Sequence, residues 1–310
     1  MCRYRMQFVT LALLWLAATV GPVRAETWYL DQQASQWKEL SKDARQALIR
    51  ADKFYSRDNL TKAARSYNKF LAESEPGTEL YKAALERQFA IAEQFLAGRK
   101  IRVLGLFRVT GYATGVKLME RITQRAGDSQ IAVESVVAVA RHYEQRGRTD
   151  RENYDLAYIK WQQVFEDYDH QLQLSEPYPT GQLGKDALLG MARCRQLLYR
   201  GPRYDVSDLI GRPFTENIYD SAKGCYEQFR LRYPEDAAKL NIDANLKKID
   251  EQAADNDYYT AKYYQKAGNR QAANLYCGMV VNSWPGTEAA RLANEMLAEN
   301  LTGQAKESDE

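Results

Sequence analysis

Residues 47–79 read ALIRADKFYSRDNLTKAARSYNKFLAESEPGTE, and residues 255–288 read DNDYYTAKYYQKAGNRQAANLYCGMVVNSWPGTE. Both stretches end in Pro-Gly-Thr-Glu, and the residues before that tetrapeptide match in kind. A small residue is followed by an aromatic residue, a turn residue, an alanine and two further packing residues. These residues are Ala51, Phe54, Asp58, Ala63, Tyr67 and Phe70 in the first copy, and Ala261, Tyr264, Gly268, Ala273, Cys277 and Val280 in the second. The chain therefore contains an internal repeat.

The spacing within each copy predicts two helices. Small and aromatic residues three, four and seven positions apart lie on one face of a helix. Alanine at the point where two antiparallel helices cross allows a close approach, and the aromatic rings fill the groove around it. The turn residue ends the first helix, and the proline ends the second. We predict a helical hairpin of about 34 residues, which is the period of the tetratricopeptide repeat.

Weaker copies of the same pattern follow one another along the chain. Counting them gives five units, near residues 44–76, 77–127, 130–169, 184–235 and 251–286. A final helix at about 288–300 can cap the array. We therefore predict an all-α fold over residues 44–300, a tetratricopeptide-repeat α-solenoid of about five helical hairpins plus a capping helix. The 21 tyrosines of the chain are expected mostly at packing positions.

Three stretches do not fit the hairpins and are interpreted as inserts, at about residues 98–111, 170–184 and 201–217. The first is apolar and rich in glycine, so we expect it either to fold back on the helices or to contact a partner. Residues 301–310 are polar and charged, and we predict that they form a disordered tail.

The first 25 residues are typical of an export signal. Arg3 and Arg5 precede an apolar run, and the small residues Val23 and Ala25 form a cleavage pattern. We expect cleavage after Ala25, with an uncleaved N-terminal anchor as the alternative. No cysteine lies near the cleavage point, directly after the apolar run, so a lipid-bearing cysteine is not predicted. The protein is expected to be exported, to the periplasm or the periplasmic face of the outer membrane, with residues 26–43 leading into the repeats.

The composition argues against nucleic-acid binding and catalysis. Lys+Arg number 43 and Asp+Glu 41 among 310 residues, a net charge of +2, so no strong basic field is present. There are two histidines, and the sequence has no Gly-rich phosphate loop, Gly-x-Ser-x-Gly or His-Glu-x-x-His motif. We predict a protein that is not an enzyme and has no metal site or cofactor. Cys194, Cys225 and Cys277 are expected to be buried as small hydrophobic residues, with a Cys194–Cys225 disulfide as the alternative.

A repeat array of this type exposes a face built from the first helices of its hairpins. Side chains one step away from the packing positions are expected there, and their mixed charge and scattered aromatic rings suit an extended peptide or a partner helix. The alternative is a face that is merely solvated. The candidates are Arg45, Asp52 and Tyr55 in unit one, Glu134, Arg141 and Glu144 in unit three, and Tyr258, Lys262 and Gln265 in unit five.

An export signal followed by five such hairpins resembles the BamD-like family of outer membrane assembly lipoproteins. The clearest pieces are residues 51–78, 217–234 and 258–287. The resemblance implies a scaffold that docks on an Omp85-type barrel and receives unfolded outer membrane proteins. Since the lipid-bearing cysteine of that family is missing, membrane contact would come only through partners. The alternative function is a general periplasmic repeat adaptor in cell-wall or secretion assemblies, since related periplasmic repeat proteins share the same short pattern.

Overall fold

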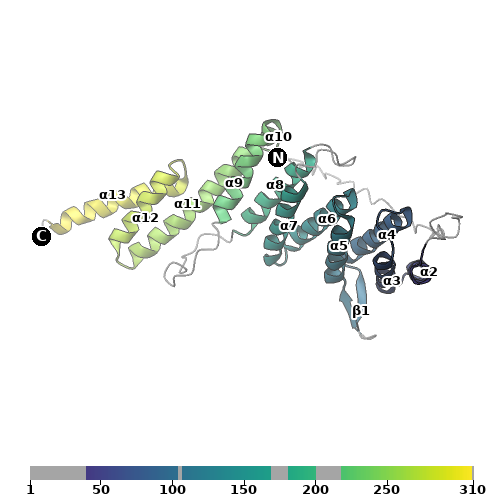
Figure 1. The fold of residues 1–310 in the computed structure, drawn as a ribbon. Helices are drawn as coiled ribbons and strands as arrows, with labels where there is room; N and C mark the ends of the chain where they lie inside the picture. Colours follow the sequence, from purple (N-terminus) through teal and green to yellow (C-terminus); the bar gives the residue numbers. More distant parts are fainter. Residues whose placement is uncertain (1–39, 104–106, 169–180, 200–217, 309–310) are drawn as a thin grey trace, which may run out of the picture. The chain divides into compact units, whose positions relative to one another are not determined.

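The computed structural model of the chain describes residues 40–103, 107–168, 181–199 and 218–308 (Figure 1). The chain divides into two compact units, Met1–Ala84 and Leu85–Glu310. The predicted signal peptide, the insert at 201–217 and most of the insert at 170–184 lie outside the described residues, as does most of the lead-in.

The first unit contains a helical hairpin, formed by α2 (Lys42–Ser56) and α3 (Leu60–Glu73), which pack against each other. Four of the residues expected at the contact between these helices are fully buried, namely Ala51, Ala63, Tyr67 and Phe70, while Phe54 is half-buried. The alanines leave room for the facing helix, and the rings remove a large apolar area from water. The helical hairpin predicted at 44–76 is therefore confirmed.

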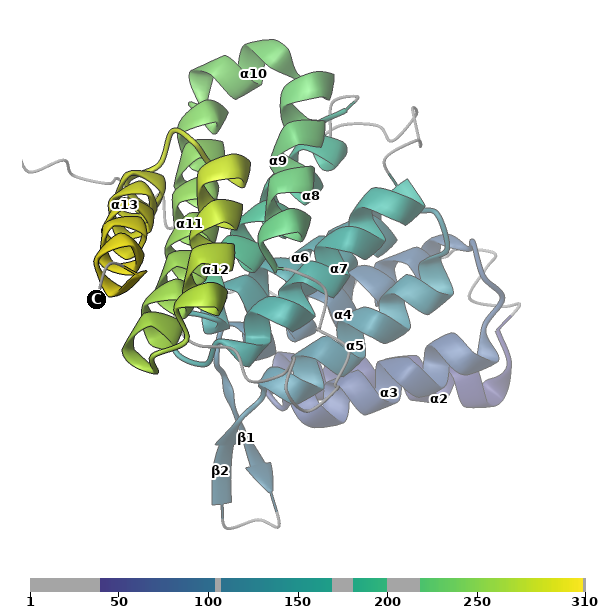
Figure 2. The same ribbon diagram turned by 90° about the vertical axis from the view of Figure 1, so that its left-hand side faces the viewer.

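The boundary between the two units falls within α4 (Glu79–Leu96), so the second unit begins with the later part of that helix. Its further helices are α5 (Tyr112–Ala126), α6 (Gln130–Arg146), α7 (Glu152–Tyr168), α8 (Gln182–Leu197), α9 (Ile218–Arg232), α10 (Pro234–Lys239), α11 (Ile242–Lys266), α12 (Arg270–Ser283) and α13 (Glu288–Ser308). From α5 to α9 and from α11 to α13, each helix packs against the next, and α11 also contacts α9 and α13 (Figure 2). This succession of neighbouring helix pairs is the all-α arrangement predicted from the sequence.

A continuous core connects the helices of the second unit from α6 to α11. Its largest fully buried side chains come from four different helices and are Trp161, Leu188, Phe229 and Ile242. A smaller cluster joins α11, α12 and α13 through alanines and Cys277. Each helix thus buries one face against its neighbours, as expected for amphipathic helices in an array.

The two best-matching repeats have the same turn between their helices. Asp58 and Gly268 both adopt positive φ, at 60° and 78°. The next residue in each copy, Asn59 or Asn269, caps the second helix with its side-chain oxygen, which accepts from the backbone N–H three residues on. The sequence match therefore reflects a matching local structure, down to the residue that ends one helix and the residue that begins the next.

The Pro-Gly-Thr-Glu segments also have a common role, at the start of the helix that follows each repeat. The Thr78 hydroxyl accepts from the backbone N–H of Tyr81 at 3.3 Å, at the start of α4. Thr287 accepts in the same way from the N–H of Ala290 at 3.1 Å, at the start of α13. Each threonine satisfies a backbone donor that would otherwise lack a partner within the helix.

The insert at 98–111 forms a β-hairpin, which is the one departure from helical structure among the described residues. Strands β1 (Lys100–Val103) and β2 (Phe107–Thr110) pair antiparallel. All four residues of β2 are exposed, Phe107 to 63% and Val109 to 44%. The expectation that this apolar stretch folds back on the helices is therefore wrong for β2, because its β-branched and aromatic residues pair as strands instead.

The hairpin is inserted into the turn between α4 and α5. Gly98 has φ 94°, and the N–H of Arg99 donates to the carbonyl of Gln94. The same bond closes the other two turns, from Asn59 to Phe54 and from Asn269 to Tyr264. In those two repeats the next residues form a helix, whereas the residues after Arg99 form strand β1. At the end of the hairpin, the N–H of Gly111 donates to the Arg99 carbonyl.

Several helix boundaries differ from the predicted ones. α8 begins at Gln182, inside the predicted insert at 170–184. α11 begins at Ile242, well before residue 251, where the fifth repeat was predicted to start. α13 continues to Ser308, so residues 301–308 are helical and the prediction of a disordered tail at 301–310 is wrong for them. The tail contains Gln, Ala, Lys and Glu but no proline, a composition that can extend a helix already nucleated by packing.

Cys194, Cys225 and Cys277 are buried, and no disulfide joins any two of them. This confirms their interpretation as small hydrophobic residues, and the alternative disulfide between the first two is not formed. Burial raises the pKa of the Cys194 thiol to about 12 and that of Cys277 to about 11. Since the thiolate is the reactive form, burial disfavours the reactive state of both side chains.

Candidate functional site

The predicted binding residues of the first unit differ in accessibility. Arg45 is half-buried, and its Nε donates to the carbonyl of Leu40 at 3.0 Å. Tyr55 is half-buried as well. Asp52 is only 5% exposed, and its carboxylate accepts the hydroxyl of Tyr67. Asp52 is therefore a correction to the candidate set, because a buried tyrosine hydroxyl needs an acceptor and this carboxylate supplies it.

Two candidates on α6 bind to α8. Nη2 of Arg141 lies 3.5 Å from Oδ2 of Asp186, and Oε1 of Glu144 lies 2.9 Å from Nε of Arg193. The Arg193–Glu144 contact is bidentate, with a second hydrogen bond of 3.3 Å from Nη2. Burial lowers the pKa of the Arg193 guanidinium, but the hydrogen bond and charge of Glu144 outweigh it and the net shift is upward. These side chains therefore link α6 to α8, the first helices of two successive hairpins.

Glu144 also anchors the largest side chain of the core. Its Oε2 accepts the indole N–H of Trp161 at 3.1 Å, and Trp161 is 2% exposed. The indole lies directly against α8, where a Cβ at Gly190 would come within 2.5 Å of the ring. Because glycine has no side chain, the indole ring can lie at this position, from which its nitrogen reaches Glu144.

Glu134, the third candidate on α6, lies close to another acid. Its side chain accepts from Nε2 of Gln130 at 2.8 Å on the same helix. Burial and the negative charge of Glu134 both raise the pKa of Glu93 on α4. The two carboxylates form a small acidic area between the first helices of successive repeats, where a cationic group of a partner would be favoured.

Two of the three candidates on α11, Tyr258 and Lys262, belong to an aromatic and cationic cluster. Nζ of Lys262 lies 4.8 Å from the ring centre of Tyr258 and 5.8 Å from that of Tyr259, within the range of cation–π attraction. Tyr259 is 40% exposed and Tyr263, one turn further along, is 47% exposed. We call Tyr258, Tyr259, Lys262 and Tyr263 the α11 tyrosine cluster.

Gln265, the remaining candidate, joins α11 to α13. Its Nε2 donates to Oδ1 of Asn300 at 2.6 Å, and its Oε1 accepts from Nδ2 of Asn300 at 3.0 Å. Asn300 is 3% exposed and also donates to Asn274 of α12 at 2.6 Å. Gln265 therefore belongs to an amide network that supplies hydrogen-bond partners to the buried Asn300 side chain.

The structure thus divides the candidates by role. Arg141, Glu144 and Gln265 lie on the expected face, but each already bonds to a side chain of another helix: Arg141 and Glu144 to α8, and Gln265 to α13. Tyr258 and Lys262 lie in the α11 tyrosine cluster. The exposed members of that cluster, Tyr259 and Tyr263, were missed because most tyrosines, these two included, were assigned to packing. Their position in sequence next to the candidates Tyr258 and Lys262 was the available signal.

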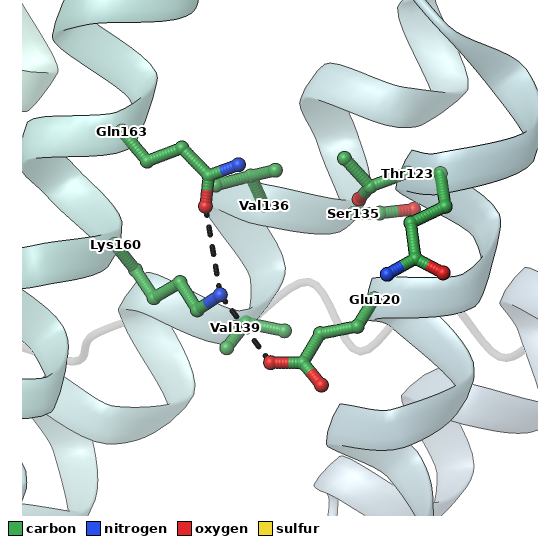
Figure 3. Close-up of a pocket in the computed structure, with 8 residues that line it drawn as sticks. Glu120, Thr123, Ser135, Val136, Val139, Lys160 and Gln163 are labelled. Atoms are coloured by element: carbon green, nitrogen blue, oxygen red, sulfur yellow. Dashed lines mark hydrogen bonds and ion pairs between the residues drawn. The ribbon is translucent and has the colours of Figure 1, made fainter.

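A cavity of about 310 Å³ lies among α5, α6 and α7 (Figure 3). Lys160 extends into it, with Nζ 3.3 Å from a carboxylate oxygen of Glu120 and 3.5 Å from Oε1 of the Gln163 side chain. The hydroxyls of Thr123 and Ser135 donate to backbone carbonyls of their own helices. Among these contacts, the Lys160–Glu120 ion pair joins α7 to α5, while the others lie within a single helix.

In the part of the chain that the structure describes, no group of three or more His, Cys, Asp or Glu side chains could hold a metal ion. Within the same residues, no helix has the length and apolar character needed to cross a bilayer. No family model matches the chain, and no curated protein matches its sequence.

Proposed function

We propose that the protein is a non-catalytic scaffold of the tetratricopeptide type that binds partner proteins or peptides. The proposal is supported by the repeated helical hairpins, which share buried alanines and the same turn in their first and last copies. Proteins built from stacked helical hairpins use extended faces of their first helices to bind peptides.

The observation that carries the proposal is the α11 tyrosine cluster. Tyr259 and Tyr263 expose two large rings on a first helix, beside the cation of Lys262. Tyrosine is enriched among the residues that dominate binding energy at protein interfaces, because it buries much area with little loss of side-chain entropy. The acidic area at Glu93 and Glu134 adds charge on another first helix of the same unit.

The finer form of the proposal places this scaffold at the periplasmic side of the outer membrane, as a BamD-like factor in β-barrel assembly. It rests on the sequence resemblance and on the export signal at residues 1–25. Its partners would be an Omp85-type barrel and unfolded outer membrane proteins, and membrane contact would come only through them. The second candidate is a general periplasmic adaptor in cell-wall or secretion assemblies, since the repeat pattern serves either role equally.

An affinity pull-down of the full-length protein from detergent-solubilised native envelopes tests the proposal, with the captured proteins identified by mass spectrometry. The informative variant is Tyr259→Ala with Tyr263→Ala, which removes the two exposed rings. The matched control is Leu231→Ala on α9, because Leu231 is 85% exposed and lies outside the cluster.

Recovery of an Omp85-type barrel by the wild type and the control, but not by the double variant, supports the BamD-like role. Recovery of a cell-wall or secretion component with the same dependence supports the adaptor role instead. If the folded wild type and the double variant capture the same proteins in equal amounts, the α11 tyrosine cluster is not the binding surface.

A further inference from the structure

The β1–β2 hairpin has two chemically different faces. The register pairs Ile101 with Val109 and Lys100 with Thr110. Side chains alternate between the faces of a strand, so Phe107 and Val109 share one face and Arg108 lies on the other with Lys100. Figures 1 and 2 both show the hairpin extending away from the ends of α4 and α5. The hairpin therefore presents an apolar face and a cationic face outside the helical packing.

The outer edge of β2 carries free backbone groups. Residues paired across antiparallel strands alternate between pairs that exchange hydrogen bonds and pairs that do not. The bond from Gly111 N–H to the Arg99 carbonyl sets this alternation, so Val109 bonds to β1 while the N–H and C=O of Arg108 and Thr110 point outward. Within the described residues the sheet has two strands, and no third strand covers this edge.

The charge of the hairpin selects what can cover the edge. Residues 98–111 contain Arg99, Lys100, Arg102 and Arg108 and no acid. Lys100 and Arg108 lie on the same face of the hairpin, and no acidic residue in this segment offsets their charge. A second copy pairing through the same edge would bring two positively charged hairpins together, which disfavours self-association.

We propose that the outer edge of β2 binds an extended segment of a partner protein in which acidic and apolar residues alternate. The segment adds a third strand, with its backbone bonded to Arg108 and Thr110. Its acidic side chains lie beside Arg108 on the cationic face, and its apolar side chains lie beside Val109 and Phe107 on the other. The added strand brings negative charge to Arg108 and covers the exposed apolar side chains of Phe107 and Val109. The site is separate from the α11 tyrosine cluster and does not depend on it.

The test uses the full chain and fluorescently labelled peptides of about eight residues, the usual span of a strand. One peptide alternates aspartate with valine, the second has the same composition in scrambled order, and the third alternates lysine with valine. Binding is measured by fluorescence anisotropy. Thr110→Pro removes an outward N–H without removing a bond between β1 and β2, Thr110→Ala is its matched control, and Arg108→Glu reverses the charge.

We expect the alternating acidic peptide to bind at least about tenfold more tightly than the other two peptides. We expect Thr110→Pro and Arg108→Glu each to weaken it by about tenfold or more, and Thr110→Ala to change it by less than about twofold. Equal binding of the acidic and scrambled peptides, or binding unaffected by Thr110→Pro, overturns the proposal. Vesicles of anionic phosphatidylglycerol test whether the hairpin binds a lipid surface instead. The proposal is also overturned if no peptide binds and the protein binds these vesicles in a way that Arg108→Glu abolishes and Thr110→Pro leaves intact.

Discussion

The indole nitrogen of Trp161 lies 3.1 Å from Oε2 of Glu144, so the largest fully buried side chain donates its hydrogen bond to a residue of the neighbouring helix α6. Glu144 in turn binds Arg193 of α8. One carboxylate thus connects three successive helices. This network lies on the face where partner-binding side chains were expected, and it shows that part of that face serves stability.

Replacing Glu144 with alanine is expected to lower the free energy of unfolding by about 1–3 kcal/mol, because the buried indole N–H loses its acceptor. Glu144→Gln should cost less, since the amide oxygen can still accept. Glu134→Ala on the same helix is the control and should change little, because Glu134 bonds within α6 and lies near another acid. The measurement is urea unfolding, and equal losses for Glu144→Ala and Glu134→Ala would contradict the role of the network.

Gly190→Ala is expected to destabilise the fold by about 1–3 kcal/mol, since the added Cβ would lie 2.5 Å from the Trp161 ring. Gly224→Ala is the matched control, because a Cβ there meets nothing within 4 Å on helix α9. It should be neutral or stabilising by up to about 1 kcal/mol, as expected for alanine in a helix. Chemical denaturation of both variants checks this, and an unchanged midpoint for Gly190→Ala would show that the ring can move aside.

The stability of the second unit should fall as the pH drops below about 6.5, the ordinary pKa of histidine. His142 is 7% exposed; burial lowers its pKa, Arg146 lowers it further, and the Leu96 carbonyl opposes both. The unfolded chain therefore takes up a proton before the folded chain does, and the loss grows until the pH reaches the lowered folded-state pKa. His142→Gln should flatten this part of the profile of unfolding free energy against pH; an identical slope in both proteins would contradict the assignment.

Cys194 and Cys277 are expected to resist thiol reagents in the folded protein at about pH 8, because burial keeps both as thiols. Both should react completely in denaturant. Mass spectrometry of alkylated peptides distinguishes these sites from other cysteines, and rapid native labelling of either one would show that its helix opens readily.

The repeat could be predicted from sequence because its signals are local. Ala51 and Ala261 are packing residues and are fully buried, and Asp58 and Gly268 occupy matching turns. The role of Asp52 could not be predicted in the same way, since it depends on the hydroxyl of Tyr67 from the facing helix.

The β-hairpin was missed for a different reason. Residues 98–111 were recognised as foreign to the repeat, but a helical template has no place for strands, and strand pairing depends on the register between two segments. The exposure of Tyr259 and Tyr263 was missed because the helical pattern predicts which face is apolar more readily than how completely a neighbour covers it.

Site-specific photo-crosslinking in native envelopes tests the central claim most directly. A photoreactive phenylalanine replaces Tyr263 in the α11 tyrosine cluster, and in a parallel sample it replaces Leu231 on α9. The account predicts a discrete crosslinked partner protein at position 263 and none at position 231. No adduct at position 263 in a folded, abundant protein, or equal adducts at both positions, would contradict the claim that this helix face binds partners.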